Sequence, residues 1–193
     1  ALPQSLNPIV AFFACLYTGM VAVPIPLPPT NRLEILKRFL GDAQSQTILT
    51  ISSISSSLWP EAEVAGLGHI RWINMDEVDQ ASATNWKNPG LSPDMPALML
   101  YTSGSTNLPR GITASQGNLV ASLEAAAAPF KDVRDFMTVV WTPMQSGIGL
   151  LLPLQPLGYD GTQLWFAPQV FIQKPITWLK LISEQRANMS IGA

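Results

Sequence analysis

The chain has few charged side chains. Asp, Glu, Lys and Arg make up 12% of its 193 residues, whereas hydrophobic residues make up 47%. Globular domains carry about 25% charged residues, so we expect other polypeptide to cover part of the surface. Intrinsic disorder is excluded because disordered segments are polar and rich in charge. The formal net charge of −2 argues against nucleic-acid binding, which needs a basic face to neutralise phosphates.

Cysteine and histidine occur once each, as Cys15 and His69. A single cysteine excludes a disulfide or a thiolate metal site within the chain. The apolar neighbours of Cys15 predict a small, buried, hydrophobic role for it. His69 falls in an expected strand outside every motif discussed below, so we interpret it as a structural or surface residue. The low cysteine content fits a reducing compartment, and we expect a cytoplasmic protein.

No hydrophobic run is long enough to cross a membrane. The apolar run at 8–23 is shorter than the roughly 20 residues that a spanning helix needs, and Gly19 interrupts it. The first residues, ALPQSLNP, lack the basic segment that opens a signal peptide, and there is no initiating methionine. We therefore expect a chain without a membrane span that begins within a larger protein.

Helix and strand patterns alternate along the chain. Helices are expected at 8–18, 31–43 and 52–59, after Ser115, within 147–157, and at 174–187. Strands are expected at 20–25, 47–51, 69–78, 96–103, 112–114, 136–143, 162–168 and 188–193. The residues at 79–94 are rich in Ser, Asn, Pro and Asp and predict a surface loop. This alternation predicts an α/β layered fold with a largely parallel sheet flanked by helices.

The segment 101–111, YTSGSTNLPRG, concentrates hydroxyl side chains ahead of a single cation. It follows the strand expected at 96–103, and a turn of this kind suits an anion. Backbone N–H groups and hydroxyls donate hydrogen bonds, and the arginine balances phosphate charge. A Walker loop is excluded because it requires Gly-Lys followed by Ser or Thr. Composition alone does not separate a phosphate site from an ordinary Ser/Thr-rich loop.

This segment resembles the phosphate-binding signature of adenylate-forming enzymes, Tyr-Thr-Ser-Gly-Ser-Thr-Gly-x-Pro-Lys-Gly. Downstream, ASQGNL and WTPMQSGIGLLLPLQPL are similar to the SHGNL and WLPPYHDMGLI segments of the fatty acyl-AMP ligase branch. The segment FAPQVFIQKPITWLKLISEQRANMSIGA matches a third motif of that branch, and IVAFFACLYTGMVAVPIPLPP resembles its first helix and strand. The resemblance covers nearly the whole chain. It implies that residues 1–193 are part of an N-terminal large domain whose C-terminal partner domain is absent.

The resemblance implies that a fatty acid carboxylate attacks the α-phosphate of ATP in the presence of Mg²⁺. The acyl group of the resulting adenylate then passes to the thiol of an acyl carrier protein. Phosphate-binding residues would be Thr102, Ser103, Gly104, Ser105, Thr106, Arg110 and Gly111. Candidates for the fatty acid site are Trp141, Met144, Ser146, Ile148 and Gly149. The apolar side chains that could wall an acyl tunnel are Trp141, Met144, Ile148, Leu150 and Leu151, for each of which ordinary core packing is the alternative. No residue is assigned to a metal.

The chain departs from the family pattern at several positions. Asn107 stands at a usual glycine, and Arg110 replaces a lysine, which keeps the charge but changes its geometry. Gln116 and Ser146 stand at usual histidines, and Gly147 stands at a usual aspartate. These motifs therefore supply no group that titrates near neutrality. Two alternatives stay open: a catalytically impaired, ligase-like binding or scaffold domain, and a fatty acyl-CoA ligase.

Overall fold

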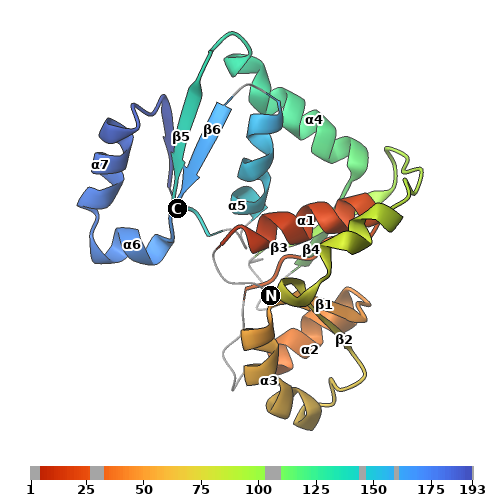
Figure 1. Cartoon of the computed structure of the whole chain (residues 1–193). Coiled ribbons are helices and arrows are strands. Elements are labelled where there is room, and N and C mark those ends of the chain that lie inside the picture. The colour runs from red at the N-terminus through yellow and green to blue at the C-terminus, as the bar shows by residue number, and fades with distance from the viewer. Residues whose placement is uncertain (1–4, 27–32, 103–109, 144–146, 159–160, 193) are drawn as a thin grey trace. The chain divides into compact units, whose positions relative to one another are not determined.

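The computed structural model of the chain describes residues 5–26, 33–102, 110–143, 147–158 and 161–192 (Figure 1). These residues divide into two compact units, 1–116 and 117–193. Each unit combines helices with a small sheet of parallel strands, so the predicted α/β class is confirmed. None of the described helices is long and apolar enough to span a bilayer.

The first unit contains two separate two-stranded sheets. Its helices are α1 (Asn7–Thr18), α2 (Leu33–Asp42) and α3 (Ser52–Val64), with short 3₁₀ turns at Met75–Glu77 and Gln80–Asn85. Its strands are β1 (Thr47–Thr50), β2 (Arg71–Asn74), β3 (Pro96–Thr102) and β4 (Arg110–Ser115). The strands β1 and β2 pair in parallel, whereas β3 and β4 pair in antiparallel. The described residues thus form small, mostly parallel sheets in place of the single sheet that the sequence predicts, and the pair β3–β4 is the antiparallel exception.

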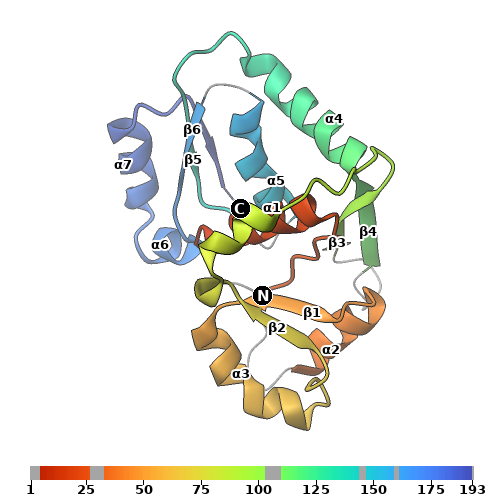
Figure 2. The same ribbon diagram turned by 45° about the vertical axis from the view of Figure 1, so that its right-hand side comes forward.

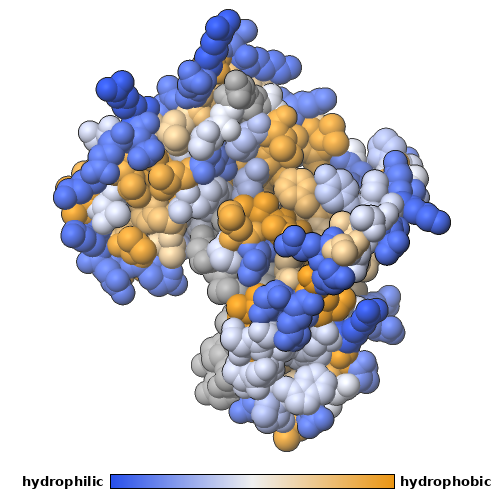
Figure 3. Space-filling model, in the orientation of Figure 1, coloured by the Kyte–Doolittle hydropathy of each residue, from blue (hydrophilic) through white to orange (hydrophobic). Residues whose placement is uncertain are grey.

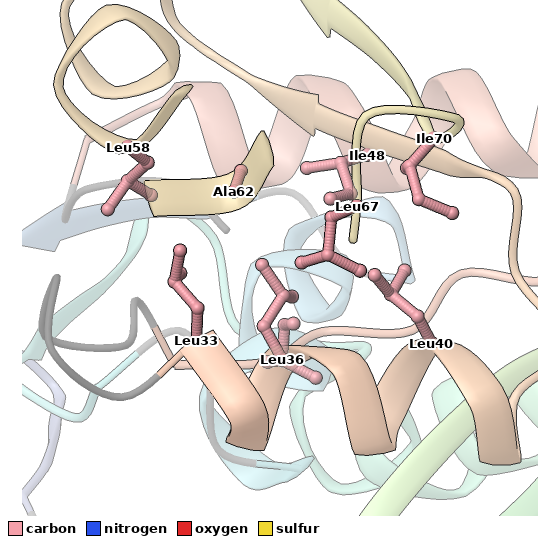
Figure 4. Close-up of a cluster of buried hydrophobic side chains, with 9 residues drawn as sticks. Leu33, Leu36, Leu40, Ile48, Leu58, Ala62, Leu67 and Ile70 are labelled. Carbon is pink, nitrogen blue, oxygen red and sulfur yellow. The ribbon is translucent and has the colours of Figure 1, made fainter. Parts of the chain in front are cut away.

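The amphipathic helix α2 holds the core of the first unit together. Leu33, Leu36 and Leu40 recur at helical spacing and are at most 8% exposed. Figure 4 shows them pointing toward the side chains of α3 and β1. The other members of this cluster are Ile25, Ile48, Leu58, Ala62, Leu67 and Ile70. The helix predicted at 31–43 is confirmed, and its buried stripe is the one that the leucine spacing predicts.

The N-terminal helix α1 ends at Gly19, whose φ of 72° is a left-handed conformation that glycine adopts without strain. Ala11 and Phe12 are buried, but Val10 is 55% and Tyr17 is 60% exposed. The segment is apolar nearly all round, a pattern that predicts a helix buried between layers, and the exposed side chains show this prediction to be wrong. The strand predicted at 20–25 is also wrong, because that segment makes only one isolated bridge, from Ala22 to Leu98.

The second unit has one sheet of three parallel strands in the order β6–β5–β7. Its strands are β5 (Phe136–Val140), β6 (Gly161–Trp165) and β7 (Met189–Ile191). Its helices are α4 (Gln116–Ala127), α5 (Gly147–Leu151), α6 (Pro168–Gln173) and α7 (Ile176–Glu184). The helix α4 begins at the boundary between the units. Short 3₁₀ turns lie at Ala128–Phe130 and Leu152–Leu157. Figures 1 and 2 show this sheet between α7 on one side and α5 on the other. The central strand β5 is the most buried, because Thr138, Val139 and Val140 have no exposed surface.

Hydrophobic side chains remain exposed on α6 and α7. Ile172 is 74% exposed, Leu179 57% and Ile176 49%, and Figure 3 shows hydrophobic surface in this region. The sequence did not predict α6, which opens at Pro168 between the expected strand and the next helix. That other polypeptide covers part of the surface remains a prediction.

Candidate functional site

The hydroxyl-rich segment connects the two strands of an antiparallel pair. Tyr101 lies opposite Gly111, and Thr102 lies opposite Arg110 at the ends of β3 and β4. Residues that face each other in such a pair have Cα atoms about 4.5–5.5 Å apart. The pairing therefore brings the first and last polar residues of the predicted phosphate segment side by side.

The strand β3 is buried in the middle of its first half. Ala97 and Leu98 have no exposed surface, as the continuous apolar run at 96–103 predicts. The predicted phosphate-binding residues Ser103, Gly104, Ser105 and Thr106 lie outside the described residues, as do the side chains of Thr102 and Arg110. Their role in binding phosphate therefore stays a prediction.

Gly111 of β4 lies against two side chains of β3, those of Met99 and Tyr101. A Cβ atom at this position would approach the Sδ of Met99 to 3.2 Å and the Cε1 of Tyr101 to 3.4 Å. The first distance is tighter than nine in ten contacts of real Cβ atoms. A side chain at position 111 would therefore press on Met99, whereas the ring of Tyr101 would be in ordinary van der Waals contact with it.

Tyr101 is held by the last turns of α2. Its hydroxyl donates a hydrogen bond of 2.6 Å to Oδ2 of Asp42, 59 residues earlier in the chain. Its ring packs edge-on against Phe39, with 4.6 Å between the ring centroids. Burial and the Asp42 carboxylate together raise the pKa of Tyr101 to about 12, so the hydroxyl stays a neutral donor at physiological pH. Sequence reasoning missed Asp42, because no local pattern links it to the segment at 101–111.

Trp141, the first predicted residue of the fatty acid site, follows β5 and belongs to an aromatic cluster. Its ring stacks on Phe171 of α6 at 4.0 Å, with 11° between the ring planes. Trp178 of α7 packs edge-on against both rings. The Nε1 of Trp141 is buried, and it has no hydrogen-bond partner among the described residues. The structure adds Phe171 and Trp178 to the surroundings of Trp141. In the sequence these two residues were noted only as part of a segment that matches the family.

The hydrogen bonds of Trp178 fix one side of this aromatic cluster to the sheet. Its Nε1 donates to Oγ of Ser190 in β7 at 2.5 Å, and that hydroxyl donates to the backbone oxygen of Val139 in β5 at 2.9 Å. These two hydrogen bonds connect α7 to β7 and β5 through the hydroxyl of Ser190. The aromatic cluster is therefore attached to the sheet through Trp178.

The remaining residues predicted for the fatty acid site lie on or before α5. Gly149 is buried within this helix. Met144 and Ser146 lie outside the described residues, and of Ile148 only the helical backbone is described. Gly147, at the usual aspartate, is the first residue of α5. It supplies no carboxylate there, because glycine has no side chain.

Two further features concern ionisable groups. His69 is exposed in the turn before β2, in agreement with its interpretation as a structural or surface residue. Within the described ranges, no group of three or more His, Cys, Asp and Glu side chains is placed to bind a metal ion.

Comparison with known proteins places the chain in a family. The family model described as AMP-binding enzyme matches residues 1–193. The chain is 35% identical to the medium-chain-fatty-acid–[acyl-carrier-protein] ligase JamA of Moorena producens (strain JHB), over 98% of this chain and 33% of that protein. It is 28% identical to the long-chain-fatty-acid–AMP ligase FadD23 of Mycobacterium tuberculosis (strain CDC 1551 / Oshkosh), over 95% of this chain and 33% of that protein.

The fold agrees with these sequence matches. A crystal structure of fatty acyl-adenylate ligase from L. pneumophila, in complex with acyl adenylate and pyrophosphate, superposes with a TM-score of 0.84 at 27% identity. The match covers 98% of this chain and 33% of that one, so the chain spans about a third of the proteins that it resembles. The chain therefore belongs to the AMP-binding, adenylate-forming enzymes and resembles their fatty acyl-AMP ligases.

Proposed function

We propose that residues 1–193 form the phosphate-binding, N-terminal part of a fatty acyl-AMP ligase. In the complete protein, a carboxylate oxygen of a fatty acid attacks the α-phosphorus of ATP. The bond between that phosphorus and the oxygen bridging to the β-phosphate breaks, and pyrophosphate leaves with the electron pair. One observation carries the proposal: the segment with the phosphate signature joins two paired strands whose ends, Thr102 and Arg110, face each other.

The donors of this segment fit a polyphosphate. Ser103, Ser105 and Thr106 offer hydroxyl donors that stay neutral, and Gly104 would let phosphate oxygens approach the backbone N–H groups. Arg110 would supply a fixed positive charge and two parallel donors. Such preorganised donors would stabilise the negative charge that collects on the departing pyrophosphate.

Mg²⁺ fits the same arrangement without a dedicated protein cage. Magnesium in nucleotide sites keeps several waters and binds mainly through substrate phosphates and one or two carboxylates. When bound, it would neutralise phosphate charge and polarise the phosphorus–oxygen bond. The hydroxyl oxygens of Thr102, Ser103, Ser105 and Thr106 have the hard-oxygen chemistry that would suit such an ion.

The fatty acid would lie against the second unit. The stacked rings of Trp141 and Phe171, braced by Trp178, offer an uncharged aromatic wall of the kind that lines acyl sites. Gly149 and Ile148 of α5, and Met144 and Ser146 before it, stay candidates for other parts of the fatty acid site. For the acceptor we propose the thiol of an acyl carrier protein. JamA, at 35% identity, is named as a ligase of medium-chain fatty acids and the acyl carrier protein.

The test is ATP–pyrophosphate exchange by the full-length protein that contains this chain. We expect exchange that depends on a medium- or long-chain fatty acid. Arg110→Ala should lower the exchange rate about ten- to a hundredfold, because a charge-assisted hydrogen bond to phosphate is lost. Arg110→Lys keeps the charge and should lose much less. Absence of exchange with every acyl chain length would refute the proposal.

The acceptor is tested separately, on the acyl adenylate once it has formed. Holo acyl carrier protein and coenzyme A are offered in parallel, and acyl thioester is measured by mass spectrometry. We expect thioester on the carrier protein. Thioester on coenzyme A alone would make the protein a fatty acyl-CoA ligase instead.

A ligase-like binding or scaffold domain is the second candidate, and the composition of the acyl motifs favours it. Gln116, Ser146 and Gly147 replace the usual His, His and Asp, so no group in these motifs titrates near neutrality. The double variant Ser146→His and Gly147→Asp distinguishes the two candidates. A large gain in exchange over a nearly inactive parent would identify a decayed enzyme, whereas brisk exchange by the parent would exclude this candidate.

A further inference from the structure

Tyr101 occupies a particular place in the pair β3–β4. It directly precedes Thr102 on β3, and it faces Gly111, which directly follows Arg110 on β4. A force applied to the ring of Tyr101 therefore acts on both strands, one residue from the point where each enters the phosphate signature. Residues this close to a site can set its geometry without touching its ligand.

Two contacts tie this ring to α2, and both belong to the first unit. Phe39 and Asp42 lie three residues apart, so their side chains emerge from the same face of the helix. Phe39 packs edge-on against the ring, and Asp42 accepts a hydrogen bond of 2.6 Å from the hydroxyl. A hydrogen bond from a neutral donor to a carboxylate is stronger than one between neutral groups. Its geometry fixes the position of the hydroxyl end of the Tyr101 ring.

The helix that carries these contacts is itself fixed. Leu36 is 2% exposed and Leu40 is 8% exposed, and both belong to the core cluster of the first unit. A helix with this much buried apolar surface moves only if the core around it repacks. Asp42 is the last residue of this helix and is itself exposed, so the buried leucines fix its backbone and the hydrogen bond to Tyr101 holds its side chain.

The strand β4 fits closely beneath the anchored ring. The Cε1 of Tyr101 lies 3.4 Å from the position where a Cβ of residue 111 would stand, which is ordinary van der Waals contact. Met99 occupies the neighbouring position on the same side of β3, at 3.2 Å from that point. The backbone of β4 thus lies against two side chains of β3, so their position determines where β4 begins.

We propose that Asp42 and Tyr101 form a positioning pair that anchors the ends of β3 and β4 to α2, and so tunes the affinity of the site for the triphosphate of ATP. The inference rests on the proposed function for the identity of the ligand. Neither residue is catalytic, because each acts through the strand ends and not on the reacting atoms. The raised pKa of Tyr101, about 12, keeps the pair intact over the pH range of an exchange assay.

The experiment compares variants of the full-length protein in ATP–pyrophosphate exchange. Tyr101→Phe keeps the ring but removes the hydroxyl, and we expect KM for ATP to rise about two- to tenfold. The KM for fatty acid and kcat should each stay within about twofold, because the acyl site and the reacting atoms are unchanged. Asp42→Ala should give the same rise in KM for ATP, whereas Asp42→Asn keeps an accepting oxygen and should restore most of the affinity.

Tyr17→Phe is the matched control. Tyr17 is 60% exposed on α1, so loss of its hydroxyl should change neither KM. An unchanged KM for ATP in Tyr101→Phe, or an equal rise in the KM values for ATP and fatty acid, would overturn the inference.

Failure of the proposed function gives a different result, because the unaltered protein would then show no exchange. In that case the dissociation constant for ATP is measured by calorimetry on the unaltered and Tyr101→Phe proteins. A weaker affinity in the variant upholds the positioning pair without the ligase activity. An equal affinity, or no binding of ATP to either protein, refutes it.

Discussion

Gly192 lies against the indole of Trp141, and a single methyl group tests this packing. A Cβ atom at position 192 would lie 2.5 Å from Cε2 and Cζ2 and 2.6 Å from Nε1 of that ring. Ordinary van der Waals contact begins at 3.4 Å, so the Gly192→Ala protein must separate the two groups by close to 1 Å. Either the indole or the backbone after β7 has to move.

The indole has little freedom to move. It stacks on Phe171 with 4.0 Å between the ring centroids. Trp178 packs against both rings and is held by a hydrogen bond to Ser190. Overpacking of this kind costs about 1–3 kcal/mol. We therefore expect Gly192→Ala to lower the free energy of unfolding by about 1–3 kcal/mol. Because Trp141 is a proposed wall of the acyl site, KM for fatty acid should rise more than KM for ATP.

The assay is urea denaturation of the full-length protein, with circular dichroism and tryptophan fluorescence as independent probes. Gly68→Ala is the control, since the nearest atom to its new Cβ would be Glu63 Cγ at 3.9 Å; a change within about 0.5 kcal/mol is expected. A double-mutant cycle with Trp141→Ala isolates the contact. If Gly192→Ala costs as much without the indole as with it, the reasoning is refuted.

Three further predictions concern stability. Leu36→Ala removes a 2% exposed side chain from the core of the first unit and should cost about 2–5 kcal/mol in urea denaturation; a cost below 1 kcal/mol would contradict that core. Hydrogen bonds from the side chain and then the backbone N–H of Ser52 lower the pKa of Asp76 below its ordinary value of 3.8. The ionised carboxylate therefore stabilises the fold above that pH, and this stabilisation is lost as the pH falls through the folded-state pKa. Asp76→Ala should flatten the acid limb of the stability curve, and an unchanged limb would exclude this contribution. Ser190→Ala leaves the Nε1 of Trp178 without its acceptor and should cost about 1–3 kcal/mol, whereas Ser190→Thr, which keeps the hydroxyl, should cost less if the bond matters.

The sequence by itself determined the features that depend on neighbouring residues. The leucine spacing at 31–43 predicted α2 and its buried stripe, because a helix repeats every 3.6 residues whatever lies around it. The apolar run at 96–103 predicted a buried strand that ends at the hydroxyl-rich segment. The order of hydroxyls, Gly104 and Arg110 pointed to phosphate, because these groups have that chemistry wherever the chain places them.

Local patterns were misleading where burial decided the outcome. The residues at 20–25 are β-branched enough to predict a strand, yet only Ala22 pairs, with Leu98. The helix α1 is apolar around its circumference, but Val10 and Tyr17 are exposed in the described chain. Strand pairing and burial depend on which partner surface is present, and a sequence window does not contain its partner.

Only the tertiary structure decided which distant residues meet. Asp42 and Tyr101 are 59 positions apart, and their bond exists because the core packs α2 beside β3. The stack of Trp141 on Phe171 exists because parallel strands bring a loop and a helix to the same edge of a sheet. Such contacts depend on the summed free energy of many burial events, none of which leaves a signature in the residues between them. The chemistry of this protein is therefore written locally in its sequence, whereas the geometry that orients that chemistry is a property of the whole fold.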